Sequence, residues 1–197
     1  MRKTGIFGGS FNPIHNGHIR LARRFLREAE LDEVWLMVSP QNPLKVNEEL
    51  LDDQRRLEMV SLALQKEKNI IASDYEFRLP KPSYTWHTLQ KLSLDYPERE
   101  FVLLIGGDNW VEFDRWFEHD KILKNYRIAV YPRHDAQINA ASLPANVMLL
   151  KASRIHVSST EVRRRISQHE PIDHLVPPVV AAKIIQEGYY QSTNKAI

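Results

Sequence analysis

The sequence predicts an α/β fold in which helices cover both faces of a doubly wound, mostly parallel β-sheet. Short apolar runs alternate with segments of helical periodicity along most of the chain. The runs are almost continuously apolar, which is typical of parallel strands buried on both faces. Glycine pairs follow two of the runs, at Gly8-Gly9 and Gly106-Gly107, where such sheets bind ligands beyond the carboxyl ends of their strands. We therefore expect a Rossmann-like sheet.

Six strands are expected from the apolar runs, which are rich in β-branched and aromatic residues. In chain order they cover Thr4–Phe7, Val34–Val38, Ile70–Ala72, Phe101–Ile105, Arg127–Tyr131 and Val147–Leu150. Helical spacing of apolar residues predicts helices over residues 19–29 and 57–64, and a third beginning near Thr85. A last helix is expected over residues 177–187, because it has proline at its start and Gly188 as a candidate C-cap.

Length and composition indicate a single α/β domain over residues 1–197, with 43% hydrophobic and 26% charged residues. The chain contains no cysteine, which excludes disulfides, thiolate metal sites and thiol nucleophiles. A reducing cytoplasm is consistent with that composition, and we expect a cytoplasmic protein. No apolar run is long enough to span a membrane, and glycines interrupt the stretch after the basic N-terminus, so a signal peptide is not expected.

Charge is distributed unevenly along the chain. The formal net charge is only +2, yet residues 151–169 hold five Lys and Arg residues against one Glu. A basic segment on a slightly acidic body favours a local anionic ligand over a long nucleic acid. We therefore expect neither a nucleic acid nor a membrane as a partner, and the sequence leaves open whether the chain forms a homo-oligomer.

The strongest functional pattern follows the first expected strand, where residues 8–18 read Gly-Gly-Ser-Phe-Asn-Pro-Ile-His-Asn-Gly-His. Without side chains at Gly8 and Gly9, backbone N–H groups can approach a phosphate closely. The following helix offers N–H groups at its N-terminus and the positive end of its dipole. His15 and His18 are three residues apart, so a helix would place both on one face. Two imidazoles there could bind an anion or stabilise charge that grows during a reaction.

A plainer interpretation is a strand-to-helix connection with two surface histidines. The complete string, however, resembles the H-x-G-H signature of the adenylyltransferase superfamily, whose members transfer AMP from ATP to a phosphorylated acceptor. Residues 8–18 match that signature throughout, with Asn12 in place of the more frequent Asp. Either residue can form an Asx turn before Pro13.

A second candidate phosphate motif lies at residues 157–163, which read Val-Ser-Ser-Thr-Glu-Val-Arg. Ser158 and Glu161 have the spacing of a helix capping box, and that role alone would explain them. Ser159 and Arg163 share a helix face beside an N-terminus, which is also a phosphate-binding arrangement. The string resembles the superfamily's (Ile/Val)-Ser-Ser-Thr-x-(Ile/Val)-Arg motif, which holds the β- and γ-phosphates of ATP.

Arg163 is accordingly the expected phosphate ligand of this motif. Its neighbours Arg164 and Arg165 are expected on a solvated face, with Arg164 the better secondary candidate.

The middle of the chain resembles the bacterial-type nicotinate-nucleotide adenylyltransferases. Residues 82–89, Pro-Ser-Tyr-Thr-Trp-His-Thr-Leu, are similar to that family's Pro-Ser-Tyr-Thr-x-x-Thr-Leu segment. Residues 104–108 and Trp116-Phe117 are similar to its Ile-Gly-x-Asp and Trp-Tyr elements. The resemblance covers essentially the whole chain. Taken without it, Trp116 and Thr85 would be interpreted as a core residue and a helix cap.

This resemblance implies a site with two substrates. The implied catalytic residues are His15, His18 and Arg163. The implied ATP contacts are Gly8, Gly9, Ser10, Phe11, Ile105, Gly106, Arg133, Ser158, Ser159, Thr160 and Arg163. The implied contacts with nicotinate mononucleotide are Lys45, Tyr84, Thr85, Trp86, Asp108, Trp116 and Phe117.

Within the acceptor site, the resemblance implies that Asp108 binds ribose hydroxyls and Trp116 stacks on the pyridine ring. Backbone N–H groups near Thr85, Trp86 and Phe117 would receive the nicotinate carboxylate.

Two positions depart from the family pattern. Residues 42–45 read Asn-Pro-Leu-Lys where the family often has Pro-Pro-His-Lys. Lys45 keeps a cation for the acceptor phosphate, whereas Leu44 removes a possible imidazole contact. Phe117 replaces a frequent Tyr, so a contact through its backbone N–H would survive but a hydroxyl contact would not.

The implied reaction joins nicotinate mononucleotide to the AMP of ATP and releases pyrophosphate. The attacking phosphate is already anionic, so alignment and charge stabilisation suffice without a protein nucleophile. We expect Mg²⁺ to be carried by ATP oxygens and water rather than by protein ligands, because no carboxylate cluster is evident.

Three alternatives stay open at this stage. A phosphopantetheine adenylyltransferase shares both phosphate motifs but is usually shorter and lacks the Pro-Ser-Tyr-Thr segment. A non-catalytic nucleotide sensor could use the same fold, although the intact His15, His18 and Arg163 disfavour it. RNA binding by residues 163–165 is weakly supported, because no aromatic platform accompanies the arginines.

Overall fold

The computed structural model describes residues 1–40, 50–132, 138–151 and 157–191. Within these ranges six strands form one sheet in the order β3-β2-β1-β4-β5-β6, and each neighbouring pair is parallel. The strands are β1 (Arg2–Gly9), β2 (Glu33–Val38), β3 (Ile70–Ser73), β4 (Arg99–Gly106), β5 (Arg127–Tyr131) and β6 (Val147–Leu149). All six predicted strands and their parallel, doubly wound arrangement are confirmed.

The helices lie between and after the strands. They are α1 (Asn16–Glu28), α2 (Asp53–Ala63), α3 (Thr85–Asp95), α4 (Gly107–Val111), α5 (His119–Asn125), α6 (Ser159–Ser167) and α7 (Pro178–Glu187). Short 3₁₀ turns add η1 (Tyr75–Arg78), η2 (Phe113–Arg115) and η3 (Ala140–Ser142). The sequence pattern did not predict α4 and α5, because each is too short for a clear helical period.

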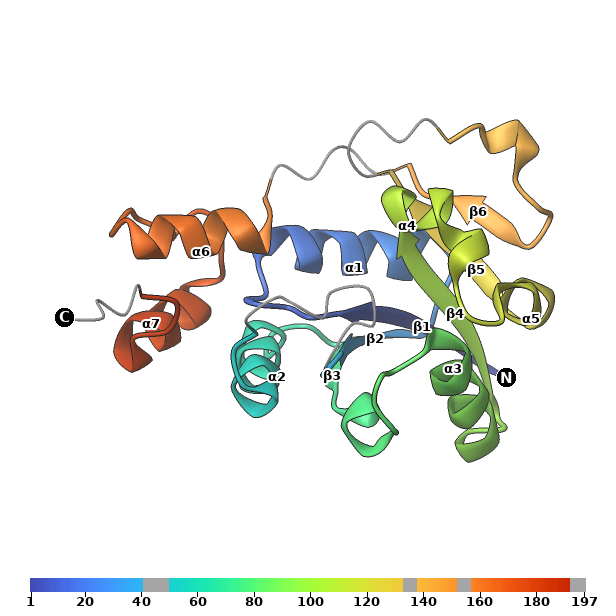
Figure 1. Cartoon of the computed structure of the whole chain (residues 1–197), viewed down its shortest axis with the longest axis horizontal. Coiled ribbons are helices and arrows are strands. Elements are labelled where there is room, and N and C mark those ends of the chain that lie inside the picture. Colours follow the sequence, from blue (N-terminus) through green and yellow to red (C-terminus); the bar gives the residue numbers. More distant parts are fainter. Residues whose placement is uncertain (41–49, 133–137, 152–156, 192–197) are drawn as a thin grey trace.

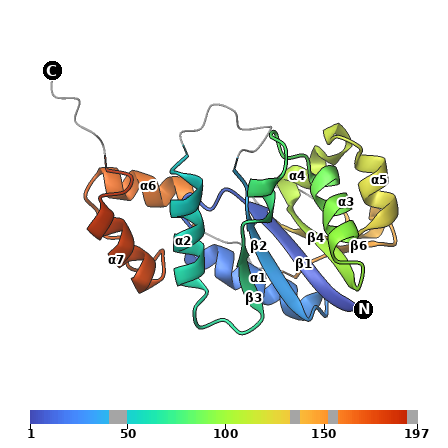
Figure 2. The ribbon, with the colours of Figure 1, turned by 90° about the horizontal axis from the view of Figure 1, so that it is seen from below.

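Both faces of the sheet are covered, as expected. Consecutive residues of a strand point to opposite faces. Phe7 of β1 and Leu104 of β4 therefore pack in the cluster that includes α1, α2, α6 and α7, whereas Ile6 and Leu103 pack against α3 and α5. Figure 1 shows α6 and α7 together at one end of the molecule near α2, and Figure 2 shows α3, α4 and α5 towards the other end. In the described part of the chain, no helix is long and apolar enough to cross a bilayer.

A buried ionic network locks the amino ends of the central strands. Glu33 of β2 is 2% exposed and accepts hydrogen bonds from Thr4 Oγ1 at 3.1 Å and Trp35 Nε1 at 2.9 Å. Its carboxylate also pairs with Arg2 at 2.7 Å and with Arg99. Several donors thus compensate the cost of burying this charge. The carboxyl ends of the same strands lie at the opposite edge of the sheet, where a cavity opens.

Candidate active site

A cavity of about 380 Å³ lies at the carboxyl ends of β1 and β4. The loop after β1, the starts of α1, α3, α4 and α6, and the residues around η2 contribute to its wall. The predicted residues that line it are Gly8, Gly9, Ser10, Phe11, His15, His18, Tyr84, Thr85, Ile105, Gly106, Asp108, Trp116, Phe117, Ser158, Ser159, Thr160 and Arg163. The structure therefore brings residues of both candidate phosphate motifs and of the predicted acceptor site to one cavity.

Of the predicted residues that the structure describes, Trp86 does not line the cavity. Lys45 and Arg133 lie outside the described residues, as does Leu44. Trp86 belongs to the first turn of α3, but its indole packs edge-on against Tyr126, with Lys121 over the ring at 5.8 Å from its centroid. The contact expected from the sequence, with the nicotinate carboxylate, is through the backbone N–H near Trp86, and that backbone lies in the first turn of α3.

The two histidines cap α1 reciprocally. His18 N donates to His15 Nδ1 at 3.3 Å, and His15 N donates to His18 Nδ1 at 3.2 Å. His15 is therefore the N-cap rather than a helical residue, and the two rings stack with centroids 3.6 Å apart. Because each Nδ1 accepts a hydrogen bond, the ring proton of each neutral imidazole is assigned to Nε2. The backbone thus fixes both the orientation and the tautomer of the pair.

The loop before α1 is held by residues distant in sequence. Asn12 is 1% exposed, and its Oδ1 accepts from Leu51 N at 3.2 Å and from the Tyr190 hydroxyl at 2.8 Å. Phe11 adopts a left-handed φ of 45° and is also buried, with its ring edge-on to His18 at 5.0 Å. This tertiary support holds a strained backbone conformation directly before the histidines.

The start of α6 docks onto the same loop. Ser158 is the N-cap, and its hydroxyl accepts from Glu161 N at 3.1 Å. Ser159 Oγ donates to Pro13 O at 2.9 Å, and Arg163 Nη1 donates to Asn12 O at 2.7 Å. The predicted phosphate residues of α6 are therefore positioned by direct contact with the first motif. A guanidinium carries five N–H donors, so the bond to Asn12 uses only part of the capacity of Arg163.

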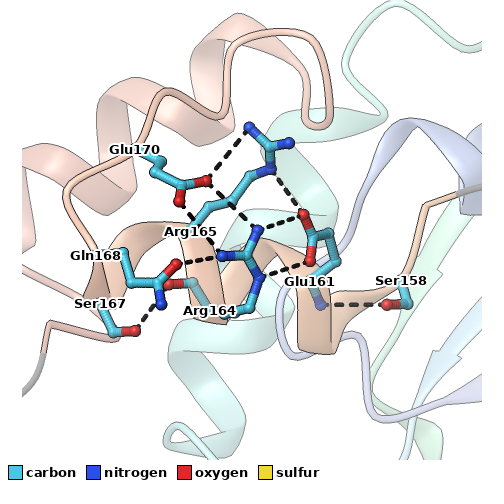
Figure 3. Close-up of polar contacts among 7 residues, drawn as sticks. All are labelled: Ser158, Glu161, Arg164, Arg165, Ser167, Gln168 and Glu170. Carbon is cyan, nitrogen blue, oxygen red and sulfur yellow. Dashed lines mark hydrogen bonds and ion pairs between the residues drawn. The ribbon is translucent and has the colours of Figure 1, made fainter.

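The other two arginines of α6 face acidic partners instead (Figure 3). Arg164 makes two hydrogen bonds with the Glu161 carboxylate, at 2.8 and 2.9 Å, and Arg165 Nε adds a third at 2.8 Å. Glu170 lies 3.3 Å from Arg164 and 3.6 Å from Arg165. These arginines lower the pKa of the Glu161 carboxyl to about 2. Arg164 and Arg165 thus form the solvated face that the sequence predicted.

Gly106 allows the Asp108 carboxylate to lie close to the end of β4. A Cβ at position 106 would come within 2.4 Å of Asp108 Oδ1 and 3.2 Å of the Tyr131 hydroxyl oxygen. Asp108 lies in the first turn of α4 and lines the cavity. A side chain at 106 would therefore displace the one carboxylate that the sequence assigned to the site.

Aromatic side chains line the other part of the cavity. The rings of Tyr84 and Phe117 are 5.1 Å apart and both are partly exposed, at 37% and 46%. Trp116 lies against Phe113 with ring centroids 5.5 Å apart. Among the described residues, its buried Nε1 has no hydrogen-bond partner. These rings lie beside the first turn of α3. Tyr84 is the N-cap residue of that helix, but its side chain makes no capping hydrogen bond.

Arg56 is an organising residue that the sequence analysis missed. It is fully buried, and its guanidinium donates to Ser10 O at 2.5 Å, Ser39 O at 2.9 Å and Leu51 O at 2.8 Å. It also pairs with Asp53 at 2.5 Å. The signal in the sequence was an arginine within the apolar period of α2, but only the fold shows which carbonyls it reaches.

Glu76 and Tyr190 were also missed, because they follow no recognisable motif. Glu76 lies in the cavity wall, and Tyr190 binds Asn12 from the C-terminal region.

The chain is similar to known proteins in sequence and in fold. The sequence pattern of the cytidylyltransferase-like family matches residues 6–165. A protein of Bacteroides thetaiotaomicron named "Probable nicotinate-nucleotide adenylyltransferase" is 48% identical over 178 residues, covering 90% of this chain and 88% of that protein. A Bacteroides fragilis protein of the same name is 46% identical over 185 residues, covering 94% and 92%.

A solved structure shares the fold. The Plasmodium falciparum nicotinic acid mononucleotide adenylyltransferase complexed with NaAD superposes with a TM-score of 0.80 over 96% of this chain and 98% of its own. Its sequence identity is 19%, so this likeness supports the fold alone.

Replacing Arg56 by Lys should lower the free energy of unfolding by about 2–4 kcal/mol. The single ammonium of lysine cannot donate to all three carbonyl groups that the planar guanidinium reaches. The exposed neighbour Arg55 offers a matched control, and Arg55→Lys should change stability by no more than about 0.5 kcal/mol. Urea unfolding of both variants measures the difference. Equal stabilities would show that the buried guanidinium does not hold these loops.

Proposed function

Because the chain belongs to the nicotinate-nucleotide adenylyltransferases of the cytidylyltransferase-like family, we propose that it transfers AMP from ATP to nicotinate mononucleotide. The products are nicotinate adenine dinucleotide and pyrophosphate. One observation carries the proposal: residues of both candidate phosphate motifs and the aromatic side chains of Tyr84 and Phe117 line the same cavity. That cavity could hold two nucleotides with their phosphates together.

ATP would occupy the side formed by the loop after β1 and the start of α6. The backbone at Gly8 and Gly9, the ordered imidazoles and the start of α6 supply N–H donors there. His18 and His15 are assigned to the α-phosphate, and Ser159, Thr160 and Arg163 to the β- and γ-phosphates. The contact of Arg163 with Asn12 fixes the distance between these two groups of donors.

We propose direct in-line attack by the acceptor phosphate on the α-phosphorus, without a covalent enzyme intermediate. The attacking oxygen is already anionic, so it needs no proton transfer to a general base. The N–H groups around the phosphates are held in place before reaction and would stabilise charge as it moves to the leaving pyrophosphate. The reciprocal bonds of His15 and His18 supply that preorganisation.

The proposed reaction uses ATP together with Mg²⁺, which neutralises phosphate charge. No three His, Asp or Glu side chains gather into a metal-binding group anywhere in the described ranges. The residues facing the phosphates are donors, which suit phosphate oxygens rather than a cation. We therefore propose that Mg²⁺ is bound by ATP oxygens and water.

We also propose that the protein acts in a reducing cytoplasm, since the chain has no cysteine.

The acceptor would occupy the aromatic side of the cavity. The first turn of α3 directs N–H groups of Thr85 and Trp86 outward from the helix end, and Phe117 lies beside Tyr84. We assign these N–H groups to the nicotinate carboxylate, Trp116 to the pyridine ring and Asp108 to the ribose. Phe117 would contribute its backbone N–H.

The acid mononucleotide should be preferred to its amide by about 10³-fold or more in kcat/KM, because backbone donors match two carboxylate oxygens but clash with an NH₂ group. Pyrophosphate release from MgATP measures this preference with nicotinate mononucleotide, its amide and phosphopantetheine as separate acceptors. Equal use of acid and amide would refute the nicotinate specificity. Turnover of phosphopantetheine alone would refute the proposed acceptor class.

His18→Ala should reduce kcat by about 10²-fold or more, the usual effect of removing one preorganised donor from a reacting phosphate. The exposed residue His174 serves as the control, and His174→Ala should leave kcat unchanged. Steady-state kinetics on both folded variants test the assignment. A near-normal kcat for His18→Ala would remove His18 from the catalytic machinery.

Arg163→Ala should weaken ATP binding by about 10- to 100-fold, since a charge-assisted hydrogen bond contributes about 1.5–3 kcal/mol. Arg165→Ala should have little effect, because Arg165 is paired with Glu161 and Glu170. Calorimetric titration with MgATP compares them. Similar losses in the two variants would indicate a diffuse basic field rather than a specific contact.

A further inference from the structure

A buried carboxyl group lies in the wall of the cavity and has no role in the chemistry described above. Glu76 belongs to η1, is 7% exposed and lines the cavity. Its Oε1 accepts a hydrogen bond from Thr88 Oγ1 at 2.9 Å, whereas its buried Oε2 has no hydrogen-bond partner among the described residues. A buried polar atom of this kind is costly unless a ligand or water satisfies it.

The position of Glu76 is on the acceptor side. Thr88, which holds it, is one turn after Tyr84 in α3 and bonds back to the Tyr84 carbonyl through its N–H at 3.1 Å. Tyr84 in turn lies against Phe117. Glu76 is thus attached to the turn of α3 to which we assign the nicotinate carboxylate.

The neighbouring wall is rich in unsatisfied donors. Ser83 Oγ and Trp116 Nε1 are, like Glu76 Oε2, buried side-chain atoms without a partner in the described chain, and all three residues line the same cavity. Indole N–H can only donate, and a hydroxyl can donate. Together with the α3 amides, they suit a ligand group that only accepts hydrogen bonds, such as a carboxylate.

An ionised Glu76 would oppose such a ligand, but its surroundings favour the neutral acid. Burial raises the pKa of the Glu76 carboxyl, while the hydroxyls of Ser39 and Thr88 lower it by smaller amounts. Ser39 nevertheless forms no hydrogen bond of normal geometry with Oε2. The other titratable or charged residues lining the cavity are His15, His18, Tyr84, Asp108, Arg115, Tyr131 and Arg163. None of these is a resolved contributor to the pKa of Glu76.

We propose that Glu76 is a specificity-determining residue that binds nicotinate mononucleotide as the neutral acid, its carboxyl O–H donating to the nicotinate carboxylate. This inference rests on the proposed function. In the neutral form Glu76 adds a donor to the acceptor site. In the ionised form it becomes an acceptor beside a like charge, so it repels the acid but can accept from the NH₂ of the amide. Protonation of Glu76 thus contributes to the choice between acid and amide.

The consequence is a pH dependence confined to the acid substrate. As pH rises through the raised pKa, Glu76 loses its proton, and KM for nicotinate mononucleotide should increase. The amide mononucleotide carries the same phosphate and ribose but no ring carboxylate, so dividing the two KM values cancels other titrations. Between pH 5.5 and 9 the ratio of KM for the acid to KM for the amide should rise at least about tenfold. The reason is that, above the pKa of Glu76, its neutral fraction falls about tenfold for each pH unit.

The Glu76→Gln variant tests the assignment, because its amide can donate but cannot titrate. Its KM ratio should stay flat across the pH range, near the value that the natural protein has at low pH. Glu98→Gln is the matched control, since Glu98 is 66% exposed and precedes β4 at the opposite edge of the sheet; it should keep the natural pH profile. A flat ratio in the natural protein, or an unchanged rise in Glu76→Gln, would overturn the inference.

A second variant decides the matter if Glu76→Gln does not fold. Thr88→Val removes the hydroxyl that lowers the pKa of Glu76, so the rise in the KM ratio should move to higher pH. An unmoved rise would contradict the role of Glu76.

If neither mononucleotide is adenylylated by the natural protein, the proposed function itself fails. Turnover of both mononucleotides with a flat KM ratio refutes the role of Glu76 alone.

Discussion

The buried guanidinium of Arg56 is the constraint on which the cavity depends. Burying a cation is expensive, and here its donors are used by the carbonyls of Ser10, Ser39 and Leu51. Ser10 follows β1, Ser39 follows β2, and Leu51 precedes α2. One side chain therefore sets the relative positions of three chain segments at the carboxyl edge of the sheet. The backbone proposed to face the nucleotides is held in place because these carbonyl groups accept hydrogen bonds from the Arg56 guanidinium.

A second set of contacts fixes the other side of the same loop. Asn12 receives hydrogen bonds from the segment before α2 and from Tyr190, and its carbonyl receives one from Arg163. Ser159 adds a bond to Pro13. Elements about 150 residues later in the chain thus support the first motif directly. Arg163, the residue proposed to hold ATP, thus also holds the loop that precedes the two histidines.

The two sides of the cavity are prepared by different means. On the proposed phosphate side, hydrogen bonds from the backbone N–H groups of His15 and His18 orient the two rings before a ligand binds. On the aromatic side, buried polar atoms of Glu76, Ser83 and Trp116 remain without partners in the described chain, and a ligand would satisfy them. The first arrangement favours stabilisation of moving charge, whereas the second favours selection of one hydrogen-bonding pattern.

The sequence by itself determined the strands and the longer helices and located two candidate phosphate motifs, because hydrophobic period and short motifs are local properties. Helix spacing together with the resemblance to the superfamily motif also separated Arg163 from Arg164 and Arg165. The tertiary structure decided which distant atoms meet: that His15 caps α1, that Arg56 reaches three loops, and that Glu76 faces the cavity. These roles depend on contacts between segments far apart in sequence. Local residue patterns do not encode such contacts, so only the folded chain reveals them.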